Sequence, residues 1–189
     1  MDSFKQTENF RMKELSETVG DMTVSLHFDR RLYKEDIRGS KAHVAMLARQ
    51  GIITGEDNEK ICAGLSEIET EIEEESFPWR PELEDIHLNI ERRLHEKIGE
   101  TAGKLHTARS RNDQVSLDMR MFLKGSCTQI QSFLTGLQSS LLDVAESNQH
   151  IVIPGYTHLQ KAQPVLFAHH MLAYFEMFDR DWVRFDQAK

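Results

Sequence analysis

The chain has 189 residues, of which 39% are hydrophobic and 29% are charged, and its formal net charge is -8. This balance indicates a soluble globular protein, either one domain of ordinary size or a piece of a larger one. The negative charge argues against general binding to nucleic acid or to an anionic membrane surface.

The sequence shows no signal-peptide pattern and no membrane-spanning pattern. No apolar run approaches membrane-spanning length, and the start does not resemble a signal peptide. Cys62 and Cys127 form no disulfide framework or metal-binding pattern. We therefore expect a reduced cytoplasmic protein without a metal site. With only four prolines and ten glycines, long segments run uninterrupted, which favours helices.

The first part of the chain predicts helices separated by glycines. Phe10 to Val19 could form a short helix, and a second helical pattern begins at Asp29. Gly39-Ser40 interrupts this pattern, so a kink or two abutting helices are expected there. Gly51 is a plausible C-terminal cap.

The next segment carries a clear start signal. Thr54 to Asp57 has the form of an N-terminal capping box. The helix that follows has one apolar stripe, formed by Ile61, Leu65, Ile68 and Ile72. The acidic run from Glu67 to Glu75 is interpreted as its solvated outer face. Phe77 to Pro81 predicts a turn.

A further helix is predicted from Glu84 to Ile98, and Gly99 ends it. Its apolar residues recur every four positions, at Ile86, Ile90, Leu94 and Ile98. The polar residues between them are expected on a face exposed to solvent: His87, Asn89 and Glu91. Gly99 to Ser110 is interpreted as a loop. Its glycines do not form a phosphate-binding loop, because the spacing is one residue short and Leu105 replaces the required Ser or Thr.

The last third predicts long helices that a compact globule of this size cannot surround. Ser110 to Asp113 favours a helix start, and a helix over 113–148 would be about 54 Å long. A heptad seam runs along it through Ile130, Leu134, Leu137, Leu141 and Val144. Apolar residues also occupy much of the circumference of a helix predicted within 164–189. We therefore predict an all-α chain: an N-terminal helical domain over 1–111, then the first part of a central helical bundle over 112–189. As written, the bundle is incomplete and requires helices from other subunits or from a continuation.

Two polar stretches carry the chemistry. The first, Lys104 to Gln114, gathers three cations just before a predicted helix N-terminus, a setting that suits carboxylates or phosphates. The alternative is a basic loop that pairs with the protein's own acidic residues. The second stretch, Pro154 to Pro164, should be irregular or extended, with Pro164 in the first turn of the next helix. Its alternative is a polar surface connection.

Together, these stretches resemble argininosuccinate lyases of the aspartase/fumarase superfamily. The matching segments are GKLHTARSRNDQ at 103–114 and PGYTHLQKAQPV at 154–165, with support from 25–43 and 84–94. The Thr-His-Leu-Gln sequence is shared across the superfamily, whereas His-Thr-x-Arg-Ser-Arg-Asn-Asp is far more selective.

The resemblance implies a cofactor-free and metal-free cleavage of argininosuccinate, a small anionic substrate, into arginine and fumarate. It implies that His158 is the acid–base group. It places substrate-binding or neighbouring groups at Ser25, His87, Arg111, Asn112 and Thr157. It also implies a cytoplasmic homotetramer in which several subunits share each active site.

Two features depart from the family pattern. A Trp-Gly-Gly-Arg-Phe stretch near the start is absent, and so is the Gly-Ser-Ser loop that supplies a second catalytic group. We therefore expect these 189 residues alone to be inactive. A sister lyase that acts on another fumarate adduct and a non-catalytic, crystallin-like scaffold remain alternatives.

Overall fold

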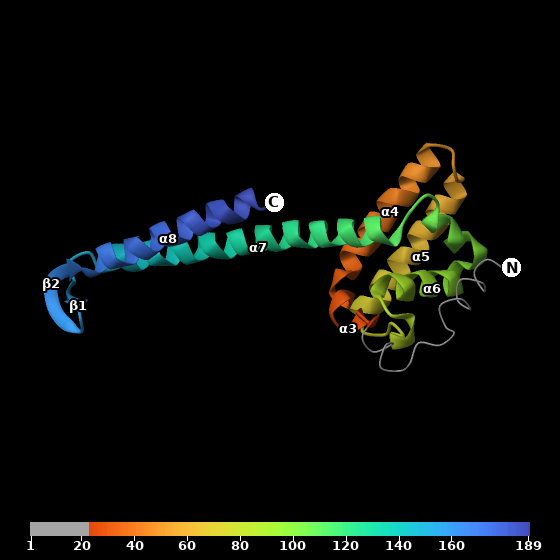
Figure 1. Cartoon of the computed structure of the whole chain (residues 1–189). Helices are drawn as coiled ribbons and strands as arrows, with labels where there is room; N and C mark the ends of the chain where they lie inside the picture. The colour runs from red at the N-terminus through yellow and green to blue at the C-terminus, as the bar shows by residue number, and fades with distance from the viewer. Residues whose placement is uncertain (1–22) are drawn as a thin grey trace. The chain divides into compact units, whose positions relative to one another are not determined.

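The computed structural model describes residues 23–189 (Figure 1). The helix expected over 10–19 lies outside the described residues. The chain divides into two compact units, one that ends at Met119 and one that begins at Arg120, and each is described by itself. The predicted domain boundary between 111 and 112 stays a prediction. None of the helices within 23–189 combines the length and apolar character that crossing a membrane requires.

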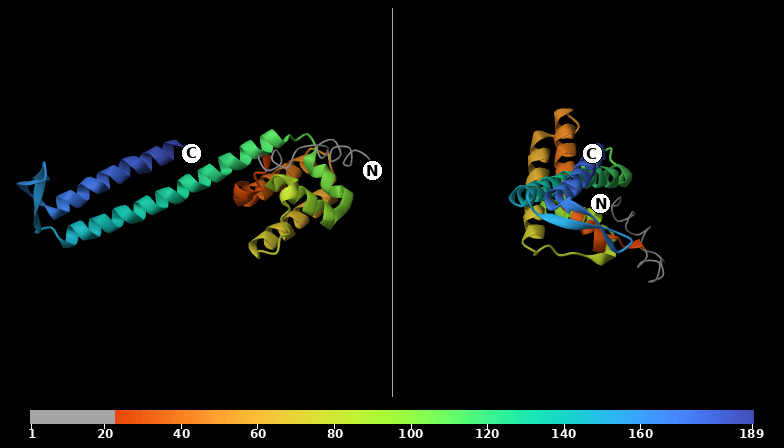
Figure 2. Two further views of the ribbon diagram at one scale, coloured as in Figure 1. Left: turned by 60° about the horizontal axis from the view of Figure 1, so that its bottom comes forward. Right: turned by 90° about the vertical axis from the view of Figure 1, so that its left-hand side faces the viewer.

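The first unit is a small cluster of helices joined by short 3-10 turns (Figures 1 and 2). Its elements are α3 (Leu26–Asp29), η1 (Arg30–Leu32), α4 (Tyr33–Arg49), α5 (Gly55–Glu73), η2 (Pro81–Leu83), α6 (Ile86–Ile98), η3 (Gly99–His106) and the first turns of α7 (Arg111–Ser147). Helix α5 packs against α4 and α6, and η3 contacts all three helices.

The predicted apolar stripes of α5 and α6 form the core of this unit. The fully buried side chains include Ile61, Leu65, Ile68, Ile86, Ile90 and Leu94. Gly64 lets the two helices approach closely, because a Cβ at this position would lie 2.7 Å from Leu94 Cδ1. Burial of these side chains is the main stabilising contribution to the unit.

The predicted helix signals are confirmed in α5 and at the end of α4. Thr54 Oγ1 accepts a hydrogen bond from the Asp57 N–H, and Asp57 Oδ2 accepts one from the Thr54 N–H, both at 3.1 Å. Gly51 follows α4 with a φ of +71°, as a left-handed cap requires.

Two local predictions are wrong. Helix α4 runs without a break through Gly39-Ser40. Gly39 serves close packing instead, because a Cβ there would meet Leu117 Cδ2 at 3.0 Å. The predicted loop over 99–110 contains the η3 turns from Gly99 to His106, whose Ala102 and Leu105 are buried.

The second unit is a helical hairpin whose two helices are joined by a β-ribbon. It contains α7 from Arg120 onward, β1 (Val152–Thr157), β2 (Gln160–Leu166) and α8 (Phe167–Gln187). The strands are antiparallel, with Val152 opposite Leu166 and Thr157 opposite Gln160. The expected extended backbone is confirmed, and the chain remains mainly helical. Pro164, however, lies in β2 opposite Pro154, and the next helix begins only at Phe167. Both strands of a two-stranded ribbon are edge strands, which tolerate proline.

The packing between α7 and α8 differs from the predicted seam. On α7 the buried residues of this unit are Cys127, Gln131, Gln138 and Ala145. Gln131 Nε2 donates to the carbonyl oxygen of Trp182, and Gln138 Nε2 donates to that of Phe175, both at 3.4 Å. No residue of α8 is fully buried. Large apolar side chains therefore stay exposed on both helices: Phe133, Leu137, Leu142, Val144, Leu172, Tyr174, Met177 and Val183. This surface agrees with an incomplete bundle.

Candidate functional site

His158 lies at the tip of the β-ribbon in the second unit. The pair Thr157–Gln160 closes a two-residue turn in which His158 has a φ of +48° and Leu159 a φ of +62°. Two positive φ values at these positions are typical of a type I′ turn, which favours Asn and Gly. His and Leu are therefore strained there, and strain of this kind is a reason to suspect function. Both side chains are exposed, Leu159 to 98%.

Arg111 lies in the first turn of α7, where three side chains from the first unit surround its guanidinium. Its Nη1 donates to Gln114 Oε1 at 2.6 Å and lies 3.0 Å from Glu91 Oε1. Its Nε lies 3.7 Å from Asp85 Oδ2. These contacts involve Nη1 and Nε, so within residues 23–189 the Nη2 hydrogens are left for a ligand.

Glu91 joins two residues of the basic stretch. It pairs with Arg111 and also with His106, whose Nδ1 is 3.4 Å from Glu91 Oε1. Burial by itself raises the pKa of Glu91, but His106 and Arg111 outweigh this effect and lower it below its ordinary value. Lys104 pairs with Asp57 at 2.7 Å. The alternative of a basic loop paired with the protein's own acids thus describes Lys104 well and Arg111 in part.

Asn112 follows Arg111 in the sequence, and Ser25 is hydrogen-bonded to Glu84, the residue before the Arg111 partner Asp85. The Ser25 N–H donates to the Glu84 carbonyl oxygen at 2.9 Å, which attaches Ser25 just before α6. Its hydroxyl donates to Asp29 Oδ2 at 2.5 Å, so the hydroxyl oxygen can still accept a hydrogen bond. The Asn112 side chain is exposed in the first turn of α7. The first unit therefore gathers Ser25, Arg111 and Asn112 around the N-terminal ends of α6 and α7.

The expectation that His87 and Asn89 face solvent is wrong, because both are buried, with 2% and 3% exposure. Asn89 Oδ1 accepts from the Arg80 N–H at 2.8 Å and holds the loop before α6. His87 Nδ1 lies 3.2 Å from Asp36 Oδ1 and 3.6 Å from Asp118 Oδ2. The four-residue stripe misleads here because side chains of α4 and α7 contact His87 on a second face of α6. Asn89 is covered instead by the loop at Arg80.

The cluster of Asp36, His87 and Asp118 is electrostatically unusual. Burial lowers the pKa of His87, but the hydrogen bond and charge of Asp36 outweigh it and raise that pKa. Burial and the nearby Asp36 carboxylate raise the pKa of Asp118 to about 7. Their ligand atoms lie within 4.8 Å of one another, a donor set that divalent ions can use. Asp36 Oδ1, however, already accepts a hydrogen bond from Gln114 and faces the His87 ring nitrogen.

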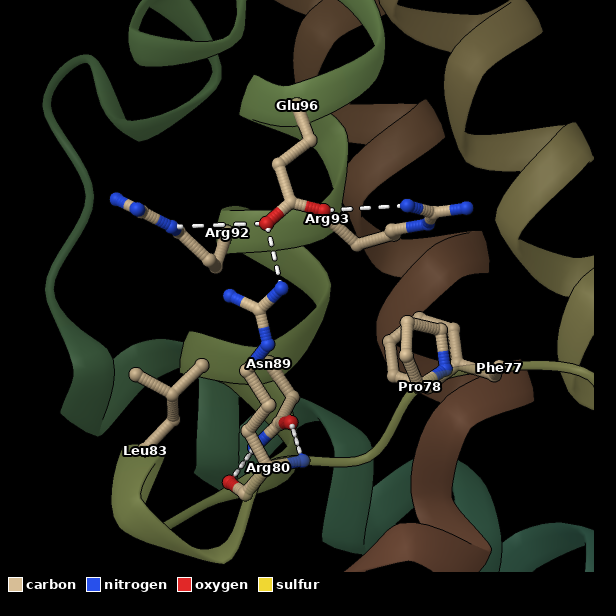
Figure 3. Close-up of a pocket in the computed structure, with 8 residues that line it drawn as sticks. All are labelled: Phe77, Pro78, Arg80, Leu83, Asn89, Arg92, Arg93 and Glu96. Atoms are coloured by element: carbon tan, nitrogen blue, oxygen red, sulfur yellow. Dashed lines mark hydrogen bonds and ion pairs between the residues drawn. The ribbon is translucent and has the colours of Figure 1, made fainter.

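A shallow pocket in the first unit lies apart from the predicted site residues (Figure 3). Its lining consists of Phe77, Pro78, Arg80, Leu83, Asn89, Arg92, Arg93 and Glu96. The Glu96 carboxylate lies among three guanidinium groups, those of Arg80 at 2.9 Å, Arg93 at 3.1 Å and Arg92 at 3.8 Å. The charged side chains that line the pocket therefore form an ion-pair network with one another.

Comparison with known proteins identifies the lineage. Residues 11–189 match the family model described as Lyase. The chain belongs to this lyase family. It is 57% identical over 176 residues to an argininosuccinate lyase from Symbiobacterium thermophilum, which covers 93% of this chain and 38% of that protein. It is also 57% identical over 163 residues to one from Syntrophotalea carbinolica, which covers 86% of this chain and 35% of that protein.

A solved structure is also similar. An EDDS lyase variant with bound fumarate matches with a TM-score of 0.73 and 28% identity, over 89% of this chain and 32% of that one. The predicted resemblance to the N-terminal part of argininosuccinate lyases is confirmed. The chain spans less than two fifths of the length of these relatives.

Sequence reasoning missed several residues that hold the site. Asp36 of α4 and Asp118 of α7 contact His87 of α6. Gln114 of α7 joins this group through its hydrogen bond to Asp36. Gln114 could have been found, because it follows Arg111 by three residues and therefore shares its helix face. Asp36 and Asp118 carried no such signal.

Proposed function

We propose that this chain is the N-terminal part of a lyase that cleaves argininosuccinate into arginine and fumarate. The observation that carries the proposal is the 57% identity to an argininosuccinate lyase across 93% of the chain. The exposed His158 and the group of polar residues around Arg111 support the same assignment.

The chemistry is an elimination that breaks a C–N bond. A base removes a proton from the carbon next to a carboxylate, the electron pair forms the double bond of fumarate, and the guanidino nitrogen leaves as arginine after it takes up a proton. An imidazole can move a proton near neutral pH, which neither Thr157 nor Gln160 can do. We assign His158 this acid–base role, because the turn displays its ring instead of burying it.

The remaining candidates would bind the substrate's carboxylates as negative charge develops during proton removal. Arg111 offers its Nη2 hydrogens, and the first turn of α7 adds the partial positive charge of a helix N-terminus. Asn112, Thr157 and Ser25 can add hydrogen bonds. His87 is buried, so we assign it the role of support for this region instead of direct contact with substrate.

Further parts of the proposal concern the whole protein. We infer a cytoplasmic homotetramer whose active sites combine groups from several subunits, so that His158 and Arg111 of one site come from different chains. We also infer that the 189 residues alone are inactive, because the Gly-Ser-Ser loop is not among them. Loss of a catalytic acid or base commonly costs 10²–10⁴-fold in rate.

A sister lyase is the second candidate, favoured by the similarity to EDDS lyase with bound fumarate. It differs from the first proposal only in the amine that leaves. The crystallin-like scaffold predicts no turnover at all. One experiment separates the three.

The test is a lyase chimera, in which this chain replaces the matching N-terminal part of the Symbiobacterium thermophilum relative. Purified chimera is incubated with argininosuccinate, and arginine and fumarate are quantified together. We expect equal amounts of both products. Fumarate release from aspartate or from other N-substituted aspartates, with none from argininosuccinate, would favour the sister lyase.

Folding must be checked in the same sample. Circular dichroism and light scattering should show a helical assembly like that of the parent relative. A correctly assembled chimera that releases fumarate from no substrate would overturn the lyase proposal and support the scaffold.

A further inference from the structure

Gln114 occupies a buried position between a cation and an anion in the first unit. Its side-chain oxygen accepts from Arg111 Nη1 at 2.6 Å, and its Nε2 donates to Asp36 Oδ1 at 2.5 Å. Gln114 is 2% exposed and Asp36 is 1% exposed. The two partners fix the amide orientation, because a carboxylate only accepts and a guanidinium only donates.

Asp36, which accepts the hydrogen bond from Gln114, is itself held in place by its surroundings. Asp36 lies on α4, and its Oδ1 also faces His87 Nδ1 of α6 at 3.2 Å. Asp36 and His87 are almost fully buried, so their positions are set by the packing of α4, α6 and α7. Gln114 therefore connects the guanidinium of Arg111, which is 30% exposed, to the interior of the unit.

Glu91 alone would not define where the Arg111 guanidinium lies. Glu91 at 3.0 Å and the more distant Asp85 at 3.7 Å are ion pairs that leave a long side chain several rotamers, whereas a buried acceptor hydrogen-bonded to Nη1 selects one. The selected arrangement keeps Nη1 and Nε on the protein and leaves Nη2 for a ligand carboxylate.

We propose that Gln114, held by Asp36, is a positioning residue that orients Arg111 for an anionic substrate. This inference rests on the proposed function, because Arg111 is there a substrate-binding group. Gln114 itself does not touch the substrate. Its loss should therefore weaken substrate binding more than it slows the chemical step.

The kinetic test uses Gln114→Met in the lyase chimera, since Met keeps the length but accepts and donates no comparable hydrogen bond. We expect KM for argininosuccinate to rise about tenfold, the lower end of the effect of losing a hydrogen bond to a charged group, because Gln114 acts on the substrate only through Arg111. We expect kcat to stay within about threefold. The matched control is Gln131→Met, another buried glutamine of α7, which should leave KM unchanged. A KM unchanged in Gln114→Met, or a fall in kcat alone, would overturn the inference.

A second test uses the full 189-residue chain and needs no activity. Hydrogen exchange at the Arg111 side-chain Nε–H is followed by NMR, with Arg109 as the internal control, since its Nη1 donates to Ser40 Oγ at 2.8 Å. In Gln114→Met we expect exchange to accelerate at Arg111 and stay unchanged at Arg109. Equal acceleration at both would show general loosening, and no change at either would show no positioning; both results contradict the inference. If the proposed function fails, the chimera is inactive with wild-type Gln114 also, while this exchange test stays valid.

Discussion

Arg93 of α6 donates two parallel hydrogen bonds to Glu71 of α5, from Nε to Oε2 at 2.8 Å and from Nη2 to Oε1 at 2.7 Å. This bidentate geometry is the strongest form of a guanidinium–carboxylate pair. The hydrogen bond from Arg93, helped by Lys97, lowers the pKa of Glu71 to about 2. The pair thus joins the two helices whose apolar stripes form the core.

The pair predicts an acid-sensitive contribution to stability. Because the pKa of Glu71 is lower in the folded chain, its contribution is complete above about pH 4.5 and is lost as the pH falls toward 2. Glu71→Gln should reduce the free energy of unfolding by about 1–2 kcal/mol at pH 6 and by much less at pH 2, after allowance for solvent screening. Urea unfolding followed by circular dichroism measures both values.

Glu67→Gln is the control for this prediction. Glu67 is 62% exposed, and among residues 23–189 its ion-pair partner is the Lys97 ammonium at 2.9 Å. Its replacement should change stability by less than about 0.5 kcal/mol. Equal effects of the two variants would contradict a special role for the bidentate pair.

The raised pKa of Asp118 predicts that stability falls as the pH rises, which is opposite to the effect of Glu71. Its pKa is raised to about 7 in the folded chain, so the folded state is penalised as the pH rises from about 4 through 7 and the carboxyl group ionises. His87, whose pKa is also raised, adds to this loss only once the pH exceeds its ordinary pKa of 6.5. The other charges that act on Asp118 are those of Asp36, Arg109 and Glu35.

Asp118→Asn removes one ionisation from this buried cluster. We expect its stability relative to the wild type to increase between pH 5 and pH 8, by on the order of 2 kcal/mol. Asp143→Asn, at an exposed position on the same helix, is the matched control for the substitution itself. A difference between Asp118→Asn and the wild type that is constant across this pH range would refute the raised pKa.

Gly64 predicts a steric effect between α5 and α6. A Cβ there would lie 2.7 Å from Leu94 Cδ1 and 3.1 Å from Ile98 Cγ2, so Gly64→Ala should destabilise the chain by about 1–3 kcal/mol. Gly125→Ala is the control, because within the described part of the chain no atom beyond its own helix backbone and chain neighbours lies within 4 Å of its Cβ position. Alanine there favours the helix by about 1 kcal/mol. Thermal unfolding should show a lower midpoint temperature for Gly64→Ala and a higher one for Gly125→Ala.

The exposed apolar side chains of the second unit predict self-association of the 189-residue chain. Leu172 and Met177 of α8 are 41% and 47% exposed, and large exposed apolar surfaces favour association. Light scattering should therefore report species larger than 21.9 kDa. The double variant Leu172→Glu/Met177→Glu should shift the distribution toward the monomer. A monodisperse, cooperatively folding wild-type monomer would contradict the bundle interpretation.

His158→Gln in the lyase chimera separates proton transfer from structural support. Glutamine stays polar but cannot titrate, so kcat should fall by at least about 10²-fold while assembly and KM change little. Leu159→Gly is the matched control in the same turn. It should relieve the strain of a positive φ and retain activity. If His158→Gln keeps more than a tenth of the parental kcat, His158 is not the acid–base group.

The sequence by itself determined the helical class, the core stripes and the lineage. The stripes through Ile61 and Ile90 could be read because helix periodicity is local, and the capping box at Thr54 because its two hydrogen bonds span three residues. The polar stretch at 154–164 stood out for the same local reason, although not as a β-ribbon. Ribbon pairing depends on cross-strand partners, and helix propensity rules do not describe it.

Only the tertiary structure decided which polar residues are buried and what holds Arg111. His87 looked solvent-facing because one apolar stripe accounts for one helix face, yet α4 and α7 cover another. Gln114 contacts Asp36 across 78 residues of chain, and no local pattern encodes a contact of that separation. Such contacts arise when packed helices bring distant side chains together, and burial then makes their hydrogen bonds obligatory.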